Sequence, residues 1–155
     1  MKLKQRAQGI IIRKDEMLFG TGLRRKRKCH YLIGGGIEEG ETPEEAMHRE
    51  LKEEINADGT ILFKFSRQVQ KNHHTFLIDI GDQKVTVGNE PDETELPLEL
   101  RELQGLEFIS LKTCEKFTDV DEAYLEALIM ECNDRNYFPN WYYKIKRIVD
   151  RGLII

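Results

Sequence analysis

The sequence predicts an α+β fold in which helices cover a mixed β-sheet. Strand-like runs and helical patterns follow one another without the regular rhythm of βαβ units, which favours a mixed sheet over a parallel one. The chain has 155 residues, of which 39% are hydrophobic and 34% are charged. This composition can supply one core and excludes extensive disorder, so we expect residues 1–155 to form a single domain.

The N-terminal half is expected to contain most of the strands. The run GIIIR at residues 9–13 and the run MLFG at 17–20 flank a short charged segment, which is typical of a hairpin. Further strand-like segments lie at residues 60–69, 75–80 and 106–111, and the polar, turn-rich segment 81–97 is expected to be mostly loop. The basic run at residues 24–28 fits a solvated hairpin loop, and the alternative is a surface close to the phosphates of a ligand.

The clearest helix signal begins at Thr42. Thr42 is a good N-cap, Pro43 suits the first helical position, and Glu45 completes a capping box three residues after the cap. We expect this helix to run to about Ile55 and to end at Asn56, because Asn tolerates the left-handed conformation of a helix terminus.

The C-terminal part is expected to be helical. Asp119 can cap a helix with Glu122 three residues later, and an amphipathic stretch over residues 141–149 follows Pro139. An aromatic cluster at residues 137–143 can stack on a base, but packing in the core or between two copies of the chain is more common for such a cluster. A homodimer is therefore left open.

Charge and cysteine content exclude several classes of protein. Lys and Arg number 24 against 28 Asp and Glu, a formal charge of −4 that argues against binding to duplex nucleic acid. The three cysteines form no CxxC pair, so the sequence contains neither a zinc site nor a disulfide framework. Apolar runs are too short for a membrane span. A cytoplasmic protein is expected, and a phosphate ligand would need positive charge from a basic patch or a metal ion.

One face of the predicted Thr42 helix gathers carboxylates. Glu50, Glu53 and Glu54 fall within an arc of about 100°, where their mutual repulsion is unfavourable. The apolar stripe that must face the core consists of Met47, Leu51 and Ile55. The acidic arc is either a solvated surface or a site for a hard cation such as Mg²⁺ or Mn²⁺. Three glycines precede the helix and allow close approach of the backbone to a ligand: Gly34, Gly35 and Gly36.

Taken together, the segment 34–57 resembles the Nudix box, G-x5-E-x7-R-E-U-x-E-E-x-G-U, in which U is a bulky aliphatic residue. The residues at the required spacing are Gly35, Glu41, Arg49, Glu50, Leu51, Glu53 and Glu54. The final glycine and aliphatic positions are Asn56 and Ala57 instead. We expect the geometry of the box to survive these two departures.

The resemblance implies a Nudix-type α/β/α sandwich and a hydrolase that uses Mg²⁺ or Mn²⁺ to cleave nucleoside diphosphates linked to another group. It implies that Glu50, Glu53 and Glu54 bind metal, with the Gly34 carbonyl as a further ligand, within a phosphate-binding loop at Gly34, Gly35 and Gly36. Glu41 and Arg49 would pair to hold that loop. Glu102 occupies a place similar to that of a further catalytic carboxylate in some members, although a solvated loop glutamate is the alternative, and Glu93, Glu95 and Glu107 compete for the role.

The substrate is inferred by elimination. Sequence features of family members that cleave NADH, ADP-ribose or dinucleoside polyphosphates are absent, which leaves (deoxy)nucleoside triphosphates, as in MutT-like members, cleaved to the monophosphate and pyrophosphate. Alternatives are a catalytically silent module that senses nucleotides and an isoprenyl diphosphate isomerase. The intact run from Arg49 to Glu54 argues against the silent module, and the short chain argues against the isomerase.

Overall fold

The computed structural model describes residues 4–88 and 105–151 of the chain. Within these residues there are seven strands: β1 (Arg6–Arg13), β2 (Glu16–Arg24), β3 (Arg27–Tyr31), β4 (Ile33–Gly36), β5 (Thr60–Lys64), β6 (His73–Asp79) and β7 (Gly105–Ser110). The helices are α1 (Pro43–Ile55), α2 (Asp119–Arg135) and α3 (Tyr142–Arg151), with a short 3₁₀ helix η3 (Cys114–Lys116) before α2.

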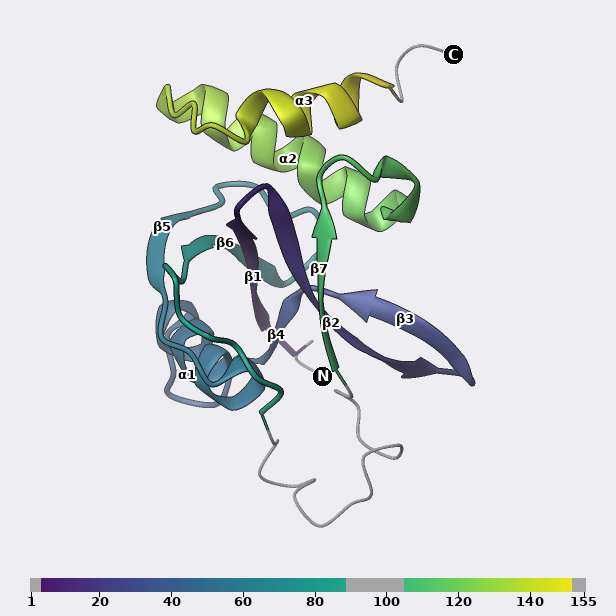
Figure 1. Cartoon of the computed structure of the whole chain (residues 1–155). Coiled ribbons are helices and arrows are strands. Elements are labelled where there is room, and N and C mark those ends of the chain that lie inside the picture. Colours follow the sequence, from purple (N-terminus) through teal and green to yellow (C-terminus); the bar gives the residue numbers. More distant parts are fainter. Residues whose placement is uncertain (1–3, 89–104, 152–155) are drawn as a thin grey trace.

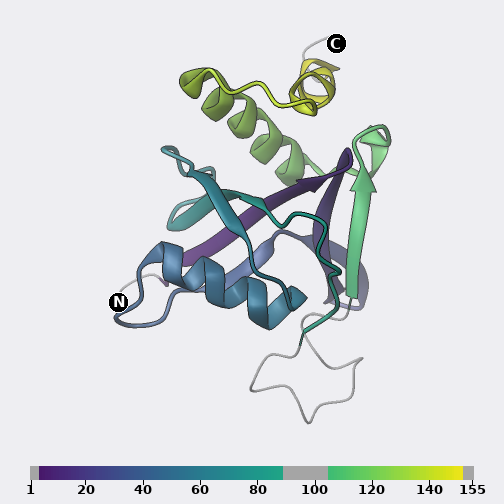
Figure 2. The same cartoon turned by 60° about the vertical axis from the view of Figure 1, so that its left-hand side comes forward.

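The strands form one mixed sheet. The order is β3-β2-β1-β6-β5, with β4 paired to β1 and β7 paired to β2. Strand β1 runs parallel to β6, whereas the other pairs are antiparallel. Helix α1 covers one face of the sheet, and α2 with α3 stacked on it covers the other (Figures 1 and 2). This is the helix-covered mixed sheet that the sequence predicts.

Each face of the sheet has its own apolar core. Alternation along β1 places Ile10 in the core beneath α2 and α3 and Ile11 in the core beneath α1. The predicted stripe of α1 lies in the second core, where Met47, Leu51 and Ile55 are fully buried. The adjacent arc of α1 carries the glutamates, and packing of the stripe places Glu50 and Glu54 against β4.

Both hairpins of the N-terminal half turn through residues with positive φ. The β1–β2 turn uses Lys14 and Asp15, with φ of 51° and 60°, and confirms the predicted hairpin. The β2–β3 turn uses Arg25 and Lys26, with φ of 53° and 65°. The basic run is therefore the tip of a two-stranded hairpin, as its first interpretation predicts.

Helix α1 confirms the predicted boundaries. Thr42 and Glu45 form the capping box, and Asn56 ends the helix in the left-handed conformation with φ of 53°. The predicted start of α2 is wrong by one residue, because the N-cap is Thr118 and its box partner is Asp121. The Thr118 hydroxyl accepts from the Asp121 N–H at 3.1 Å, which satisfies an amide that Asp119 cannot reach from inside the first turn.

Strand β5 ends at Lys64, five residues before the sequence predicts. The Ser66 N–H donates to the Glu131 carboxylate of α2 at 2.7 Å and so leaves the strand ladder. Among residues 4–88 and 105–151, no helix is both long and apolar enough to cross a membrane.

Candidate active site

The site is built where β4 leads into α1. A Cβ atom on Gly35 would lie 2.4 Å from Oε1 of Glu50, and one on Gly34 would lie 2.2 Å from the carbonyl oxygen of Ala7 in β1. The backbone of β1 therefore excludes a side chain at Gly34, and a side chain at Gly35 would have to displace the Glu50 carboxylate. The glycines let the β4 backbone lie directly against β1 on one side and against a carboxylate of α1 on the other.

Arg49 is at the centre of the carboxylate face. Its Nε donates to Glu41 Oε2 at 2.7 Å, and its Nη2 donates to Glu41 Oε1 and to the Gly36 carbonyl, both at 2.9 Å. Its Nη1 contacts Glu50 Oε1 at 2.9 Å and Glu53 Oε2 at 3.1 Å. Arg49 and Glu41, which the resemblance implies as a pair, thus join the loop before α1 to the helix. The contacts with Glu50, Glu53 and Gly36 were not foreseen from the sequence.

The electrostatics of this group are unbalanced. One guanidinium lies within 3.1 Å of the carboxylates of Glu41, Glu50 and Glu53, and a fourth carboxylate, that of Glu38, lies 4.0 Å away. The hydrogen bond from Arg49 lowers the pKa of Glu41, and the same bond, with the nearby charge of Glu50, raises the pKa of Arg49 further above its usual range. The Glu41 carboxylate and the Arg49 guanidinium are therefore both charged at neutral pH. Because carboxylates outnumber cations in this group, it can attract a second cation.

The third glutamate of the helix, Glu54, contacts the backbone of β4. Its residue is 5% exposed, and its Oε2 accepts the Gly34 N–H at 3.0 Å. Gly34 therefore contributes an amide to the carboxylate cluster, while its carbonyl as a metal ligand stays a prediction. The bond fixes the start of the glycine run against the last turns of α1.

Metal-binding capacity follows from the donor atoms and their neighbours. In the described part of the chain, no three His, Cys, Asp or Glu side chains converge closely enough to hold a metal ion as they stand. The Arg49 guanidinium nitrogen already lies between Glu50 and Glu53, in contact with both. Carboxylate oxygens gathered around one cation are the donor set that Mg²⁺ and Mn²⁺ prefer, so the residues fit a divalent ion if Glu53 turns from Arg49 toward it.

The other predicted carboxylates are not part of this group as described. Glu102, Glu93 and Glu95 lie outside the described residues. Glu107 lies on β7 opposite Phe19, which belongs to the core beneath α2, and its Oε1 is 3.7 Å from Nζ of Lys116. Glu107 thus faces away from α1, which removes it as a partner of the three helix glutamates.

Residues 86–88, which the sequence predicts only as loop, contact the C-terminal end of α1. The Gly88 N–H donates to the Glu54 carbonyl at 2.7 Å, and a Cβ on Gly88 would lie 1.7 Å from the Glu53 carbonyl oxygen. The Asn56 side chain donates to Thr86 Oγ1 at 2.8 Å. In the sequence, Gly88 was the only signal for this contact. A lone glycine in a polar segment indicates a close approach of the backbone but does not identify the partner.

Comparisons with known proteins agree with this geometry. The NUDIX domain profile matches residues 3–128. The RNA pyrophosphohydrolase of Francisella tularensis subsp. mediasiatica is 28% identical over 145 residues, which cover 90% of this chain and 79% of that protein.

Solved structures share the fold. A Nudix hydrolase from Nitrosomonas europaea matches with a TM-score of 0.62 and 16% identity over 88% of this chain and 75% of that one. A structure from work on MutT of Aliivibrio salmonicida and Vibrio cholerae matches with a TM-score of 0.56 and 19% identity over 97% and 99% of the two chains. Because the profile spans most of the chain, this protein belongs to the Nudix family, whose hydrolases generally use divalent metal ions.

Proposed function

We propose that this protein is a metal-dependent pyrophosphohydrolase that cleaves a nucleoside triphosphate to the monophosphate and pyrophosphate. The observation that carries the proposal is the convergence of Glu50 and Glu53 on one cationic nitrogen, next to Glu54 and the glycine run. A triphosphate is densely negative, and the protein has a formal charge of −4, so productive binding needs a local cation.

The residues have distinct proposed roles. Glu50, Glu53 and Glu54 would hold Mg²⁺ or Mn²⁺, with the Gly34 carbonyl as a further ligand. When bound, the ion would neutralise phosphate charge, polarise the phosphoryl oxygen and acidify water. Arg49 positions the carboxylates by linking Glu41 of the loop to the helix. Glu102 stays our candidate for the additional carboxylate that accepts a proton from the attacking water.

A second substrate is favoured by a specific finding. The relatives from Francisella tularensis carry the name RNA pyrophosphohydrolase, so the triphosphate at the 5′ end of an RNA chain is a candidate as well as a free nucleotide. Both contain the same phosphoanhydride bonds. The site described above therefore accounts for either substrate, and the choice depends on contacts beyond the phosphates.

Three further expectations remain proposals. The silent nucleotide-sensing module is the alternative function, and it predicts binding without turnover. A cytoplasmic location is in keeping with three cysteine thiols, none of which forms a disulfide. A homodimer would be visible as a doubled mass in solution.

The test is a product analysis with a matched pair of variants. Purified protein, with Mg²⁺, Mn²⁺ or EDTA, is incubated with nucleoside triphosphates and with a 5′-triphosphorylated RNA oligonucleotide, and products are identified by mass. We expect metal-dependent release of intact pyrophosphate, reduced by about 10²–10³ in Glu53→Gln and retained in Glu44→Gln, which alters an exposed glutamate of the same helix. Stepwise release of orthophosphate, or turnover that persists in EDTA, would contradict the proposal.

A further inference from the structure

The tip of the β2–β3 hairpin carries a dense positive charge that the proposed catalytic site does not use. Residues 25–28 are Arg, Lys, Arg and Lys, and all four are exposed. Within the described parts of the chain, none of them has an ion pair, whereas Lys144 and Lys146 of α3 are paired with Asp15 and Asp150. Unpaired cations side by side repel one another, so an anionic partner would relieve this repulsion.

The hairpin extends away from the catalytic helix. Figure 1 shows its tip pointing to the side opposite α1. Strand β3 nevertheless leads almost directly into β4, so the chain connects the tip to the glycine run of the site. At about 3.3 Å per residue, the extended chain from Lys26 to Gly34 spans at most about 26 Å. The tip is therefore suited to a part of the substrate that lies several groups beyond the triphosphate.

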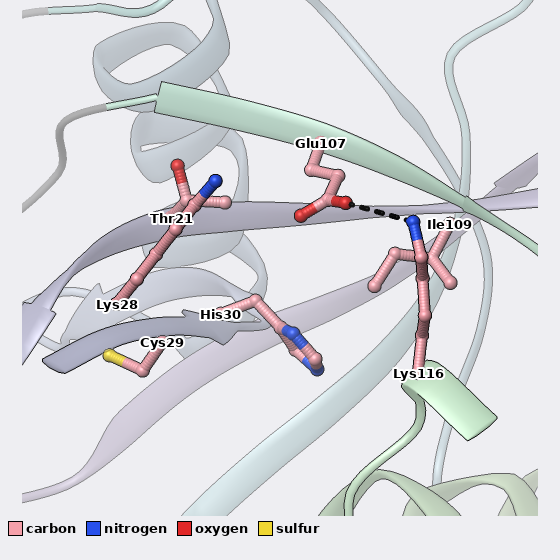
Figure 3. Close-up of a pocket in the computed structure, with 7 residues that line it drawn as sticks. All are labelled: Thr21, Lys28, Cys29, His30, Glu107, Ile109 and Lys116. Atoms are coloured by element: carbon pink, nitrogen blue, oxygen red, sulfur yellow. Dashed lines mark ion pairs between the residues drawn. The ribbon is translucent and has the colours of Figure 1, made fainter.

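A hollow lies at the base of the hairpin. It has a volume of about 240 Å³ and is lined by Thr21, Lys28, Cys29, His30, Glu107, Ile109 and Lys116. Figure 3 shows that Lys116 and Glu107 point toward one another, while Lys28 reaches in from β3. Glu107 offsets the charge of Lys116, so Lys28 is the lysine of the hollow that forms no ion pair with a described residue. Lys28 beside a partly apolar floor can accept an anionic group together with a flat or apolar one. The positive surface thus continues from the tip into a concave site.

The turn contains two charged residues in a backbone conformation that disfavours them. Arg25 and Lys26 both have φ in the left-handed region, where a two-residue hairpin turn favours Asn and Gly. Cationic side chains at these positions add strain to the turn and contribute no described contact within the chain. Replacing Arg25 and Lys26 with Asn and Gly would remove two charges and suit the backbone of the turn better. The effect of charge can therefore be tested without destabilising the turn.

We propose that the β2–β3 hairpin and the hollow at its base bind the sugar–phosphate backbone of single-stranded RNA whose 5′ triphosphate is at the Nudix site. The inference rests on the proposed function and selects RNA as its substrate class. Four consecutive cations with no intervening carboxylate match a regularly spaced phosphate chain. An acidic protein partner is less favoured, because the strand that carries the cations leads into a site for phosphates.

The experiment compares two variants of equal charge. Arg25→Asn with Lys26→Gly removes two positive charges from the hairpin, and Lys146→Gln with Arg147→Gln removes two from α3, where a second basic hollow lies. Binding of a 5′-hydroxyl single-stranded RNA oligonucleotide is measured by fluorescence anisotropy across a salt series. This probe has no phosphoanhydride bond, so its binding is independent of whether the protein is a hydrolase.

We expect the wild type and the α3 variant to bind with a similar salt dependence. The hairpin variant should bind more weakly, with the slope of log K against log salt reduced by about 1.4, because about 0.7 counterions are released per phosphate contact on single strands. Its KM for 5′-triphosphorylated RNA should rise while its kcat/KM for a free nucleoside triphosphate stays unchanged. Its melting temperature should equal or exceed that of the wild type.

The proposal is overturned if the wild type does not bind the RNA, or if the two variants lose affinity equally. It is also overturned if a polyglutamate peptide of equal charge binds more tightly than the RNA, which would indicate an acidic protein partner. Loss of turnover on free nucleotides in the hairpin variant would place these residues at the phosphates of every substrate instead. If no substrate is hydrolysed but the RNA binds through the hairpin, the proposed function fails and the RNA-binding surface stands.

Discussion

Two networks of glutamate and arginine, one on each side of the sheet, differ in their balance of charge. On α1, the single Arg49 faces Glu41, Glu50 and Glu53. On α2, the buried Glu131 faces both Arg67 and Arg135, and Asp134 also pairs with Arg67 at 3.0 Å. The first group has more carboxylates than cations, whereas the second has two carboxylates and two arginines.

The second network has an evident structural role. Glu131 accepts the Ser66 N–H at 2.7 Å, and Arg135 donates to the Lys64 carbonyl at 2.9 Å and lies 4.4 Å above the Phe63 ring. These contacts tie the segment after β5 to α2. The comparison indicates that a network with equal numbers of carboxylates and arginines serves to hold structural elements together. A helix face with more carboxylates than cations can bind an additional cation. Each network can be broken by one nearly isosteric change.

Glu53→Gln should have the largest effect, and it should act on catalysis. We expect kcat to fall by about 10²–10³, comparable to the loss of one preorganised electrostatic contact in the transition state. Thermal unfolding in rising Mg²⁺ should show less stabilisation than in the wild type, because a ligand that binds only the folded state stabilises it by mass action. Full Mg²⁺-dependent turnover in this variant would remove Glu53 from the metal site.

Without metal, the same variant should differ little in stability from the wild type. The sequence alone predicts a gain, because one of three repelling charges is removed. In the structure, Glu53 also contacts Arg49 at 3.1 Å, so the change removes an attraction together with the repulsion. Urea unfolding in EDTA should therefore give a difference within about 0.5 kcal/mol.

Glu131→Gln should show the opposite pattern. We expect the free energy of unfolding to fall by about 2 kcal/mol, less than the 3–5 typical of a fully buried pair, because the Arg67 and Arg135 side chains are 33% and 32% exposed. Turnover per folded molecule should be unchanged. A loss of kcat with normal stability would show that the two networks are coupled through the sheet.

The pH dependence of stability should further distinguish the wild type from Glu131→Gln. Burial of the Glu131 carboxylate opposes its ionisation, but hydrogen bonds from Ser66 and Arg135 and the charge of Arg67 lower its pKa below the usual range. The stabilisation from this group is therefore present above the unfolded-state pKa of about 4.3 and is lost as pH falls through the lower folded-state pKa. Urea unfolding from pH 7 to pH 3 should show the wild type converging on Glu131→Gln at acid pH; parallel curves would contradict this.

The sequence predicts local features of the site better than contacts between distant segments. The boundaries of α1, its apolar stripe and the left-handed Asn56 follow from capping and periodicity, which act over a few residues. The placement of Glu107 on the far face depends on the register of β7 against β2, and no local pattern fixes it. The same is true of Glu131, whose partners Ser66 and Arg67 lie more than sixty residues away.

Asn56 is an instructive case, because its local role was predicted and its distant contact was not. From the left-handed terminus alone, Asn56→Gly is expected to be neutral or slightly stabilising. In the structure, the Asn56 amide also donates to Thr86 Oγ1 at 2.8 Å, next to the segment that contacts the end of α1. We now expect Asn56→Gly to lose about 0.5 kcal/mol or slightly more, within the range of one exposed hydrogen bond.

Three further variants separate the contributions at this position. Thr86→Val removes the partner hydroxyl and should lower stability by a similar amount, while Thr86→Val in the Asn56→Gly background should cost nothing more. Asn56→Val should be the least stable, by about 1 kcal/mol or more, because a β-branched residue resists positive φ. The wild type and the four variants are compared by urea unfolding at pH 7. Additive losses in the double variant would show that the Asn56–Thr86 bond contributes nothing, and a stable Asn56→Val protein would refute the left-handed terminus.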